Sequence, residues 1–375
     1  MKIAFLIGTV HPAAGQTHNI AEIIKYLLSR HNWKISVLTH EIYYPLIKGM
    51  DEGSVEVIKV NRYYSAIFLQ GGLSSMLRDY DIIYVKGSFP YVFAAVRSGK
   101  PTVLVVHHMD TLKSFKGFLP KLRVLAANLM TGYVIRKPDA VVTVSGELAS
   151  FYSRKYGIKA HVIEDQISDT YFGQQVRTAP DESKCIRLLT VGNWDGPNGR
   201  KRHDVLLRYF ADCIKTRSEL RLSMVGLSNE NLKVLGQLSE NMHIKDYVTL
   251  KGFIDEEELI QEYVGNHVYV TATTYEGFYR QIVEGFATGM PALVYDSRKI
   301  IKEPSSCASA NHVLKSGAGV LFSDSESFNS ALTKIIANYS EYSGKARIYA
   351  KLFSREAVGV KTERLLESMA SKQEL

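Results

Sequence analysis

The segment Tyr275–Pro291, YEGFYRQIVEGFATGMP, restricts most strongly how this chain can fold. It follows an apolar, β-branched run, His267–Ala272, and its own apolar residues Ile282 and Phe286 recur at helical spacing. This pattern predicts a buried strand, a tight turn and a helix. Gly277 lets the turn backbone approach a ligand closely, and the free N–H groups at the start of the helix favour a phosphate.

Two glutamates bracket the predicted turn. Glu276 directly precedes Gly277, and Glu284 follows eight positions later, inside the predicted helix. Carboxylates at these places can accept hydrogen bonds from the hydroxyl groups of a sugar. A pair of glutamates on a helix is also typical of a solvated face, so the pair alone leaves both interpretations open. A second buried strand, Ala292–Tyr295, is expected after the helix.

The first part of the chain predicts a Rossmann-like α/β domain over residues 1–172. The apolar runs predict strands at 3–7, 35–39, 55–60, 81–85 and 102–106, and an amphipathic helix at 19–29. The loop after the first strand lacks the GxGxxG pattern of dinucleotide-binding proteins. His107 follows the strand 102–106, at the sheet edge where open α/β sheets bind ligands. A structural hydrogen-bonding role is the alternative for this histidine.

The α/β alternation restarts at residues 186–191, after a polar stretch, 173–184, that we expect to be a linker. The following loop, 192–203, contains three glycines and the basic residues Arg200, Lys201 and Arg202. Backbone amides and fixed cations at the start of a helix suit a diphosphate. A basic surface loop is the alternative. We therefore expect a second Rossmann-like domain at 185–354, with a final helix at about 355–371 packed back on the first domain.

Composition supports two folded domains and indicates the compartment. The 375 residues are 46% hydrophobic, which is enough for two cores. No apolar run is long enough to span a membrane, and no signal peptide is recognisable at the N-terminus. The three cysteines are odd in number and lack a CxxC pair, which argues for a reducing cytoplasm and against structural zinc or disulfides.

The positive charge is concentrated in the first half of the chain. Up to Thr170 there are 20 Lys and Arg against 13 Asp and Glu, whereas the remainder has 26 against 25. The first half is therefore expected to meet an anionic partner. Basic and large apolar residues alternate over 111–138, a pattern that suits an anionic membrane surface at the inner face of the membrane. An amphipathic helix packed on its own sheet is the alternative, and no nucleic acid partner is expected.

The Glu-Gly-Phe triplet with its second glutamate resembles the signature of the retaining glycosyltransferases of family 4. These enzymes have the GT-B fold, in which two Rossmann-like domains face each other across a cleft. The resemblance implies that Glu276 faces the donor sugar and that Glu284 holds the ribose of the nucleotide. It also implies that the amides of Gly277 and Phe278 meet the diphosphate.

Other parts of the chain resemble the same family in the same order. The resemblance places Gly15 near the donor diphosphate, His107 beside the anomeric carbon and Lys201 on the diphosphate. Asn193 stands where the family has an arginine, and Arg202 or Arg200 is expected to supply that charge.

The sequence also departs from the family pattern. Asp165 and Gln166 replace an Asn-Gly pair, and Tyr279 and Arg280 stand where small or apolar residues are usual. A Gly-Gly-x-x-Glu loop that touches the donor is missing after Tyr295. These departures leave the identity of the donor sugar open.

The resemblance implies transfer of a sugar from a nucleoside diphosphate sugar to a hydroxyl group of a glycan or lipid-linked acceptor, with retention at the anomeric carbon. No cofactor and no metal are expected, because GT-B enzymes stabilise the leaving diphosphate with lysine and helix amides. One alternative is another GT-B enzyme, such as an epimerase or a phosphorylase. The other is a non-catalytic sugar-nucleotide-binding or membrane-scaffold protein.

Overall fold

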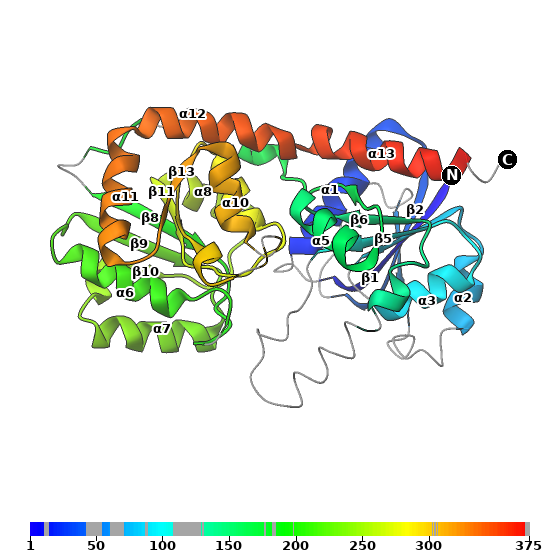
Figure 1. The fold of residues 1–375 in the computed structure, drawn as a ribbon, viewed down its shortest axis with the longest axis horizontal. Helices are drawn as coiled ribbons and strands as arrows, with labels where there is room; N and C mark the ends of the chain where they lie inside the picture. The colour runs from blue at the N-terminus through cyan, green and yellow to red at the C-terminus, as the bar shows by residue number, and fades with distance from the viewer. Residues whose placement is uncertain are drawn as a thin grey trace. The chain divides into compact units, whose positions relative to one another are not determined.

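The computed structural model describes residues 1–10, 15–42, 55–60, 71–86, 89–107, 129, 131–175, 178–181, 185–197, 199–301, 303, 305 and 307–371. The chain divides into two compact units (Figure 1). One unit is Met1–Gln166 with Arg355–Leu375, and the other is Ile167–Ser354. Residues 167–172 thus lie in the second unit, where Ile167 N donates to Phe353 O at 2.8 Å, and not in the first domain as the sequence analysis placed them.

The first unit is built on a parallel sheet with the strand order β3-β2-β1-β4-β5-β6-β7. Its strands are β1 (Lys2–Val10), β2 (Lys34–Ile42), β3 (Val55–Lys59), β4 (Ile82–Lys86), β5 (Thr102–Val106), β6 (Ala140–Thr143) and β7 (His161–Val162). Every residue of β4, β5 and β6 is buried, as expected for parallel strands that are covered on both faces. The helices are α1 (Gly15–Arg30), α2 (Gly71–Leu77), α3 (Phe89–Arg97), α5 (Gly146–Tyr156) and α13 (Arg355–Ser371).

The C-terminal helix α13 packs on α1 in this first unit (Figure 1). Val358 and Leu366 of α13 join the same apolar core as Ile23 of α1. Gly359 faces the ring of Tyr26 so closely that an added Cβ would lie 2.3 Å from a ring carbon. The absence of a side chain at Gly359 therefore sets how near the two helices can approach.

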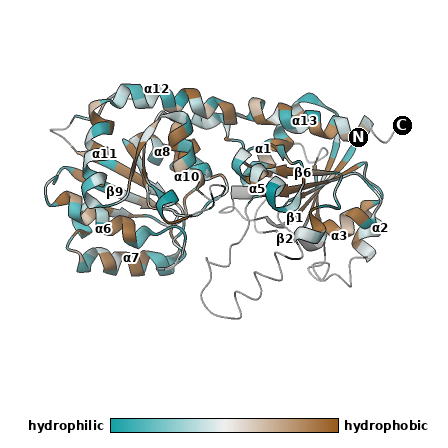
Figure 2. Cartoon of the chain, viewed as in Figure 1, coloured by the Kyte–Doolittle hydropathy of each residue, from teal (hydrophilic) through white to brown (hydrophobic). Residues whose placement is uncertain are grey.

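The second unit is built on a parallel sheet with the order β10-β9-β8-β11-β12-β13. Its strands are β8 (Ile186–Val191), β9 (Leu220–Val225), β10 (Val248–Leu250), β11 (Val268–Thr271), β12 (Ala292–Tyr295) and β13 (Gly319–Phe322). Its helices are α6 (His203–Ile214), α7 (Asn229–Asn241), α8 (Glu256–Gly265), α9 (Arg280–Ala287), α10 (Ala308–Ser316), α11 (Ser325–Ala337) and α12 (Tyr339–Ala350). Figure 2 shows hydrophobic strands inside this unit and helices with a hydrophilic outer face.

Within the described residues the predicted strands and helices are present, and the predictions differ from the structure mainly at the ends of these elements. Strand β10 ends at Leu250, and Asp255 then caps α8 by accepting from Glu258 N at 2.9 Å. Ser145 caps α5 in the same way, through Leu148 N at 3.3 Å. Most of segment 111–138 lies outside the described residues. No helix in the described ranges is long and apolar enough to cross a bilayer.

Candidate functional site

The strand order of the second unit reverses direction at β8. β9 follows β8 in the sequence and lies on one side of it, whereas β11 lies on the other side. Ligands of open parallel sheets bind at such a reversal, beyond the carboxyl ends of the strands. The loop after β8 carries Lys201, and the turn after β11 carries Glu276.

Asp195 stabilises the conformation of the basic loop after β8. Its carboxylate accepts hydrogen bonds from Arg200 N at 2.9 Å and from Lys201 N at 3.0 Å. Gly199 lies so close to Asp195 that an added Cβ would be 2.2 Å from Oδ1. The loop conformation therefore requires glycine at this position, and it fixes the direction in which Lys201 leaves the backbone.

Lys201 and Glu276 form a largely buried ion pair. Lys201 Nζ lies 2.8 Å from Glu276 Oε1, and Arg200 Nη1 lies 3.2 Å from Glu276 Oε2. Burial by itself disfavours the ammonium group, but the pKa of Lys201 is nevertheless raised, and the attraction of Glu276 is the largest contribution in that direction. Lys201 therefore remains a cation where an anionic ligand would meet it.

The two aromatic side chains of the turn Glu276–Tyr279 are buried. Phe278 packs its ring edge to face against His312 and Phe353, and its carbonyl accepts a hydrogen bond from His312 Nε2. Helix α9 starts directly after Tyr279, which provides no side-chain cap. The contact with a diphosphate expected of the Gly277 and Phe278 amides stays a prediction.

Glu284 is buried inside α9 and has a partner for each of its carboxylate oxygens. Arg280 Nε donates to Oε1 at 2.7 Å, and Tyr263 OH donates to Oε2 at 3.0 Å. Burial, reinforced by the nearby carboxylate, raises the pKa of Tyr263 well above its usual value. The ribose contact expected of Glu284 stays a prediction. Sequence analysis assigned no role to Tyr263 and no partner to Arg280.

The arginines beside Lys201 have different surroundings. Arg200 reaches Glu276, whereas the guanidinium carbon of Arg202 lies 5.5 Å from the centre of the Tyr295 ring. Arg202 is a non-glycine residue with a left-handed backbone, φ 48°, and it precedes α6. Of the two arginines that the sequence left open, Arg200 is thus the one that contacts Glu276.

His203 is a member of the site that sequence analysis missed. Its buried ring lies with Nε2 2.8 Å from Gly192 O, and burial lowers its pKa from 6.5 to about 4. The neutral ring therefore donates from Nε2 to this carbonyl and ties the end of β8 to the start of α6. Its position directly after three basic residues was the one sequence signal available.

The remaining predicted residues belong to the first unit. Gly15 opens α1, and His107 follows β5, so both lie at the carboxyl edge of that sheet. His107 Nδ1 lies 3.6 Å from Asp165 Oδ2, and the buried Lys86 at the end of β4 places Nζ 3.5 Å from Asp165 Oδ1. Asn19 of α1 also donates to Asp165. The aspartate that departs from the family pattern is therefore the centre of a polar cluster.

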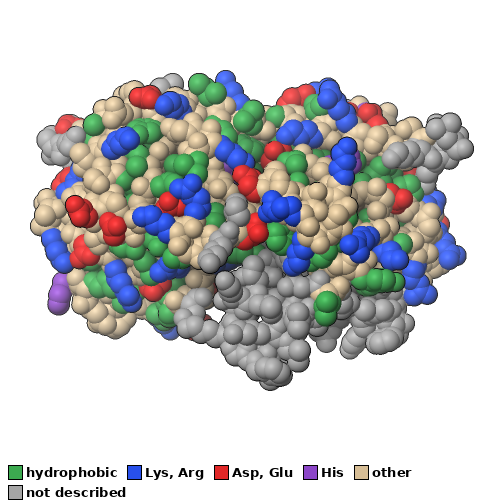
Figure 3. Space-filling model, in the orientation of Figure 1, with side chains coloured by type: hydrophobic (Ala, Val, Ile, Leu, Met, Phe, Trp, Pro, Cys, Tyr) green, Lys and Arg blue, Asp and Glu red, His purple; other side chains and the backbone are tan. Residues whose placement is uncertain are grey.

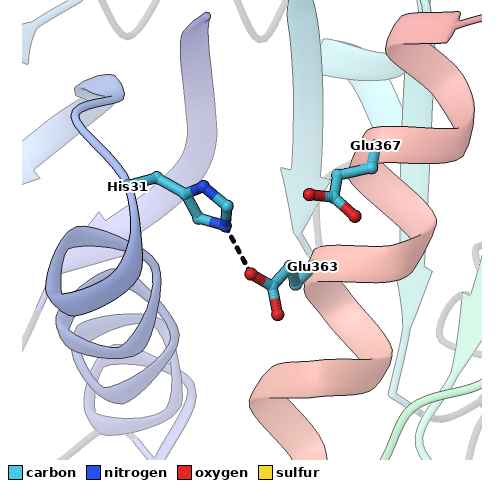
Figure 4. Close-up of side chains that lie close together, drawn as sticks. All are labelled: His31, Glu363 and Glu367. Atoms are coloured by element: carbon cyan, nitrogen blue, oxygen red, sulfur yellow. Dashed lines mark hydrogen bonds and ion pairs between the residues drawn. The ribbon is translucent and has the colours of Figure 1, made fainter.

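Among the described residues, one set of potential metal ligands lies close together, and it is in the first unit. It consists of His31, Glu363 and Glu367, between α1 and α13 (Figure 4). His31 already pairs with Glu363, which also accepts from Tyr26 OH at 2.9 Å. These contacts connect α13 to α1, and none of the three residues belongs to the site of the second unit.

Two family models match consecutive parts of the chain. Residues 14–165 match Glycosyltransferase Family 4, and residues 188–352 match Glycosyl transferases group 1. The chain belongs to the family 4 glycosyltransferases. The resemblance seen in the sequence is thereby confirmed.

Solved structures of other proteins share the fold of this chain. Anabaena HepE in complex with UDP is 17% identical, with a TM-score of 0.72 over 98% of this chain and 100% of that one. Sucrose-phosphate synthase from Thermosynechococcus elongatus is 16% identical, with a TM-score of 0.76 over 99% of this chain and 100% of that one. The expected α/β GT-B fold is confirmed.

Curated relatives match over shorter stretches. The GtfA subunit of the UDP-N-acetylglucosamine–peptide N-acetylglucosaminyltransferase of Streptococcus pneumoniae serotype 4 is 29% identical over 96 residues, which are 26% of this chain and 18% of that protein. The Streptococcus gordonii GtfA subunit is 36% identical over 80 residues, which are 21% of this chain and 15% of that protein. The matches thus span less than a fifth of the length of these relatives.

Proposed function

We propose that this protein is a retaining glycosyltransferase. It would transfer a sugar from a nucleoside diphosphate sugar to a hydroxyl group of a glycan or lipid-linked acceptor. The observation that carries the proposal is the buried pair of Lys201 and Glu276 beside the uncapped start of α9. Because UDP is the nucleotide bound to Anabaena HepE, UDP-sugars are the first donors to test.

The pair suits a donor that carries an anion at one end and hydroxyl groups at the other. A diphosphate would take the ammonium of Lys201 and the amides at the start of α9. Glu276 would then be released to accept hydrogen bonds from the sugar hydroxyls. Negative charge grows on the leaving diphosphate during transfer, so a fixed cation there lowers the barrier. Retention by same-face attack requires no protein nucleophile, and none is assigned.

The roles in the first unit follow from the family. His107 would contact the reacting sugar, with Asp165 beside its Nδ1, and Gly15 would let the backbone approach the diphosphate. No metal is included, since Lys201 and the amides would supply the positive charge. We therefore expect turnover to survive EDTA, whereas a loss that Mg²⁺ restores would contradict a metal-free mechanism.

Nucleotide binding is the first test of the proposal. Titration calorimetry with UDP, GDP and ADP should show one preferred nucleotide. The Lys201→Met variant should bind it at least tenfold more weakly, because a phosphate contact is lost. Lys215→Met is the matched control, since Lys215 is exposed and pairs with Asp212. Equal binding by wild type and Lys201→Met would reject the assigned site.

Turnover separates an enzyme from a protein that only binds nucleotide sugars. Glu276→Gln keeps the shape of the side chain but removes its charge. This variant should retain nucleotide binding within a few-fold and should lose release of UDP from a UDP-sugar. If wild type and Glu276→Gln both bind without turnover on any glycan or lipid-linked acceptor, the non-catalytic alternative is favoured.

A further inference from the structure

Tyr279 adopts a backbone conformation that suits glycine better than tyrosine. Its φ of 61° and ψ of 66° lie in the left-handed region, directly before α9. Bulky residues rarely adopt this conformation, because Cβ crowds the following carbonyl oxygen. Such strain persists where the surroundings fix it, and it occurs often at functional sites. A tyrosine at this position therefore requires an explanation from its side chain.

The hydroxyl group of Tyr279 is held by the end of β11. It lies 2.9 Å from Thr271 Oγ1, 3.2 Å from Thr273 Oγ1 and 3.1 Å from Tyr269 OH. All four side chains are buried, so these hydrogen bonds are shielded from water. The far end of the Tyr279 ring is thus fixed to the strand that precedes the turn.

The face of the same ring supports the ammonium group of Lys201. Nζ lies 4.5 Å from the ring centroid, within the range of a cation–π interaction. Glu276 is the charged partner of Lys201, at 2.8 Å. A carboxylate neutralises an ammonium and repels an incoming phosphate. The ring attracts the ammonium and carries no net charge, so it can keep Lys201 in place without competing with an anionic ligand.

We propose that Tyr279 is a positioning residue that holds Lys201 toward the diphosphate when Glu276 exchanges that lysine for the donor sugar. The inference rests on the proposed function, since it assumes that Lys201 meets a diphosphate. It accounts for the strained backbone, for the hydroxyl network and for the location of the ring with one role. It also explains why a large aromatic residue stands where the family has small or apolar residues.

Ring fluorination tests this role without changing the shape of the side chain. The compared variants are Tyr279→Phe and a phenylalanine at position 279 that carries three ring fluorines. Fluorine withdraws electron density from the ring face and so weakens its attraction for a cation. We expect the dissociation constant for UDP to rise about three- to tenfold from the plain to the fluorinated ring. Tyr279→Phe is the reference for this comparison, because both proteins lack the hydroxyl hydrogen bonds and differ only in the electron density of the ring.

The same pair of rings is then placed in a Lys201→Met background. In this background the variants with the fluorinated and the plain ring should bind UDP with equal affinity, because the cation is absent. Melting temperatures of the unliganded variants, which keep the ring volume, show whether each is folded. Equal affinities with Lys201 present, or an equal fluorine effect without it, would overturn the positioning role. If Lys201→Met does not weaken UDP binding, the diphosphate role of Lys201 is rejected before the role of Tyr279 is tested. If wild type binds none of UDP, GDP and ADP, both the proposed function and the role of Tyr279 are rejected.

Discussion

The buried imidazole of His203 makes the stability of the second unit depend on pH. Its pKa of about 4 in the folded chain, against 6.5 for an exposed imidazole, means that only the unfolded chain takes up this proton between these pH values. Protonation therefore favours unfolding as the pH falls. The contribution of His203 is complete above pH 6.5 and is lost toward pH 4.

The corresponding prediction is a pH-dependent loss of stability that His203 carries. Between pH 7 and pH 4 the free energy of unfolding should fall by up to about 3 kcal/mol more in wild type than in His203→Asn. Urea unfolding at pH 7, 5.5 and 4.5 measures both slopes. The variant removes this titration and leaves the other histidines, so identical slopes in the two proteins would contradict the assignment.

At the scale of elements, the loop after β8 depends on one close contact. Gly199 touches Asp195, whose carboxylate holds the amides of Arg200 and Lys201. A Cβ at position 199 would displace Asp195 and release both amides. The loop would then no longer direct Lys201 toward Glu276.

We therefore expect Gly199→Ala to weaken UDP binding by about tenfold, the effect of losing about one charge-assisted hydrogen bond. Titration calorimetry measures the change. Gly146→Ala is the control, because an added Cβ at Gly146 has no neighbour within 4 Å and Gly146 lies in the first unit. An unchanged affinity in Gly199→Ala would show that the loop conformation is not required.

The contact between α13 and α1 is the second element-scale feature, and it stabilises the first unit. Gly359→Ala would press a methyl group into the Tyr26 ring, and overpacking of this kind costs about 1–3 kcal/mol. Gly344→Ala in α12 is the control, since its Cβ would meet nothing within 4 Å.

The two tryptophans allow this destabilisation to be located. Trp33 belongs to the first unit and Trp194 to the second. In a Trp194→Phe background, where Trp33 is the reporter, Gly359→Ala should lower the unfolding midpoint. In a Trp33→Phe background the transition reported by Trp194 should move less. Equal shifts would show that the two units unfold as one.

At the scale of the whole molecule, the charge of the chain is uneven along the sequence. Figure 3 shows Lys and Arg side chains dispersed over the visible face and interspersed with acidic ones. The basic and apolar segment 111–138 lies mostly outside the described residues, so its membrane contact remains a proposal. Four of its basic residues alternate with large apolar ones: Lys113, Lys116, Lys121 and Arg123.

We expect the protein to float with vesicles that contain an anionic lipid at low salt. Replacing these four residues by glutamine should reduce the bound fraction at least about tenfold, since each basic residue near such a surface contributes about 1 kcal/mol. The matched control changes four exposed basic residues of the second unit, Lys215, Lys245, Lys251 and Lys345, to glutamine. Equal loss in both variants, or no flotation of wild type, would contradict membrane contact through this segment.

Much of this fold was predictable because its signals are local. Alternating β-branched residues and helical spacing act within a few positions of the chain. They predicted the strands Thr102–Val106, Ile186–Val191 and Ala292–Tyr295 with their observed ends. The resemblance of the motifs to the family then predicted that Lys201 and Glu276 both contact the donor.

Tertiary structure alone decided which side chains meet. Lys201 comes from the loop after β8, whereas Glu276 and Tyr279 come from the turn after β11, and only the folded sheet brings the ammonium to the carboxylate and the ring. The same holds for the choice of Arg200 over Arg202 as a partner of Glu276. The amino-acid sequence determined the two α/β domains and their family through local backbone preferences. The charges and contacts at the site depend on through-space distances, which no periodicity in the chain contains.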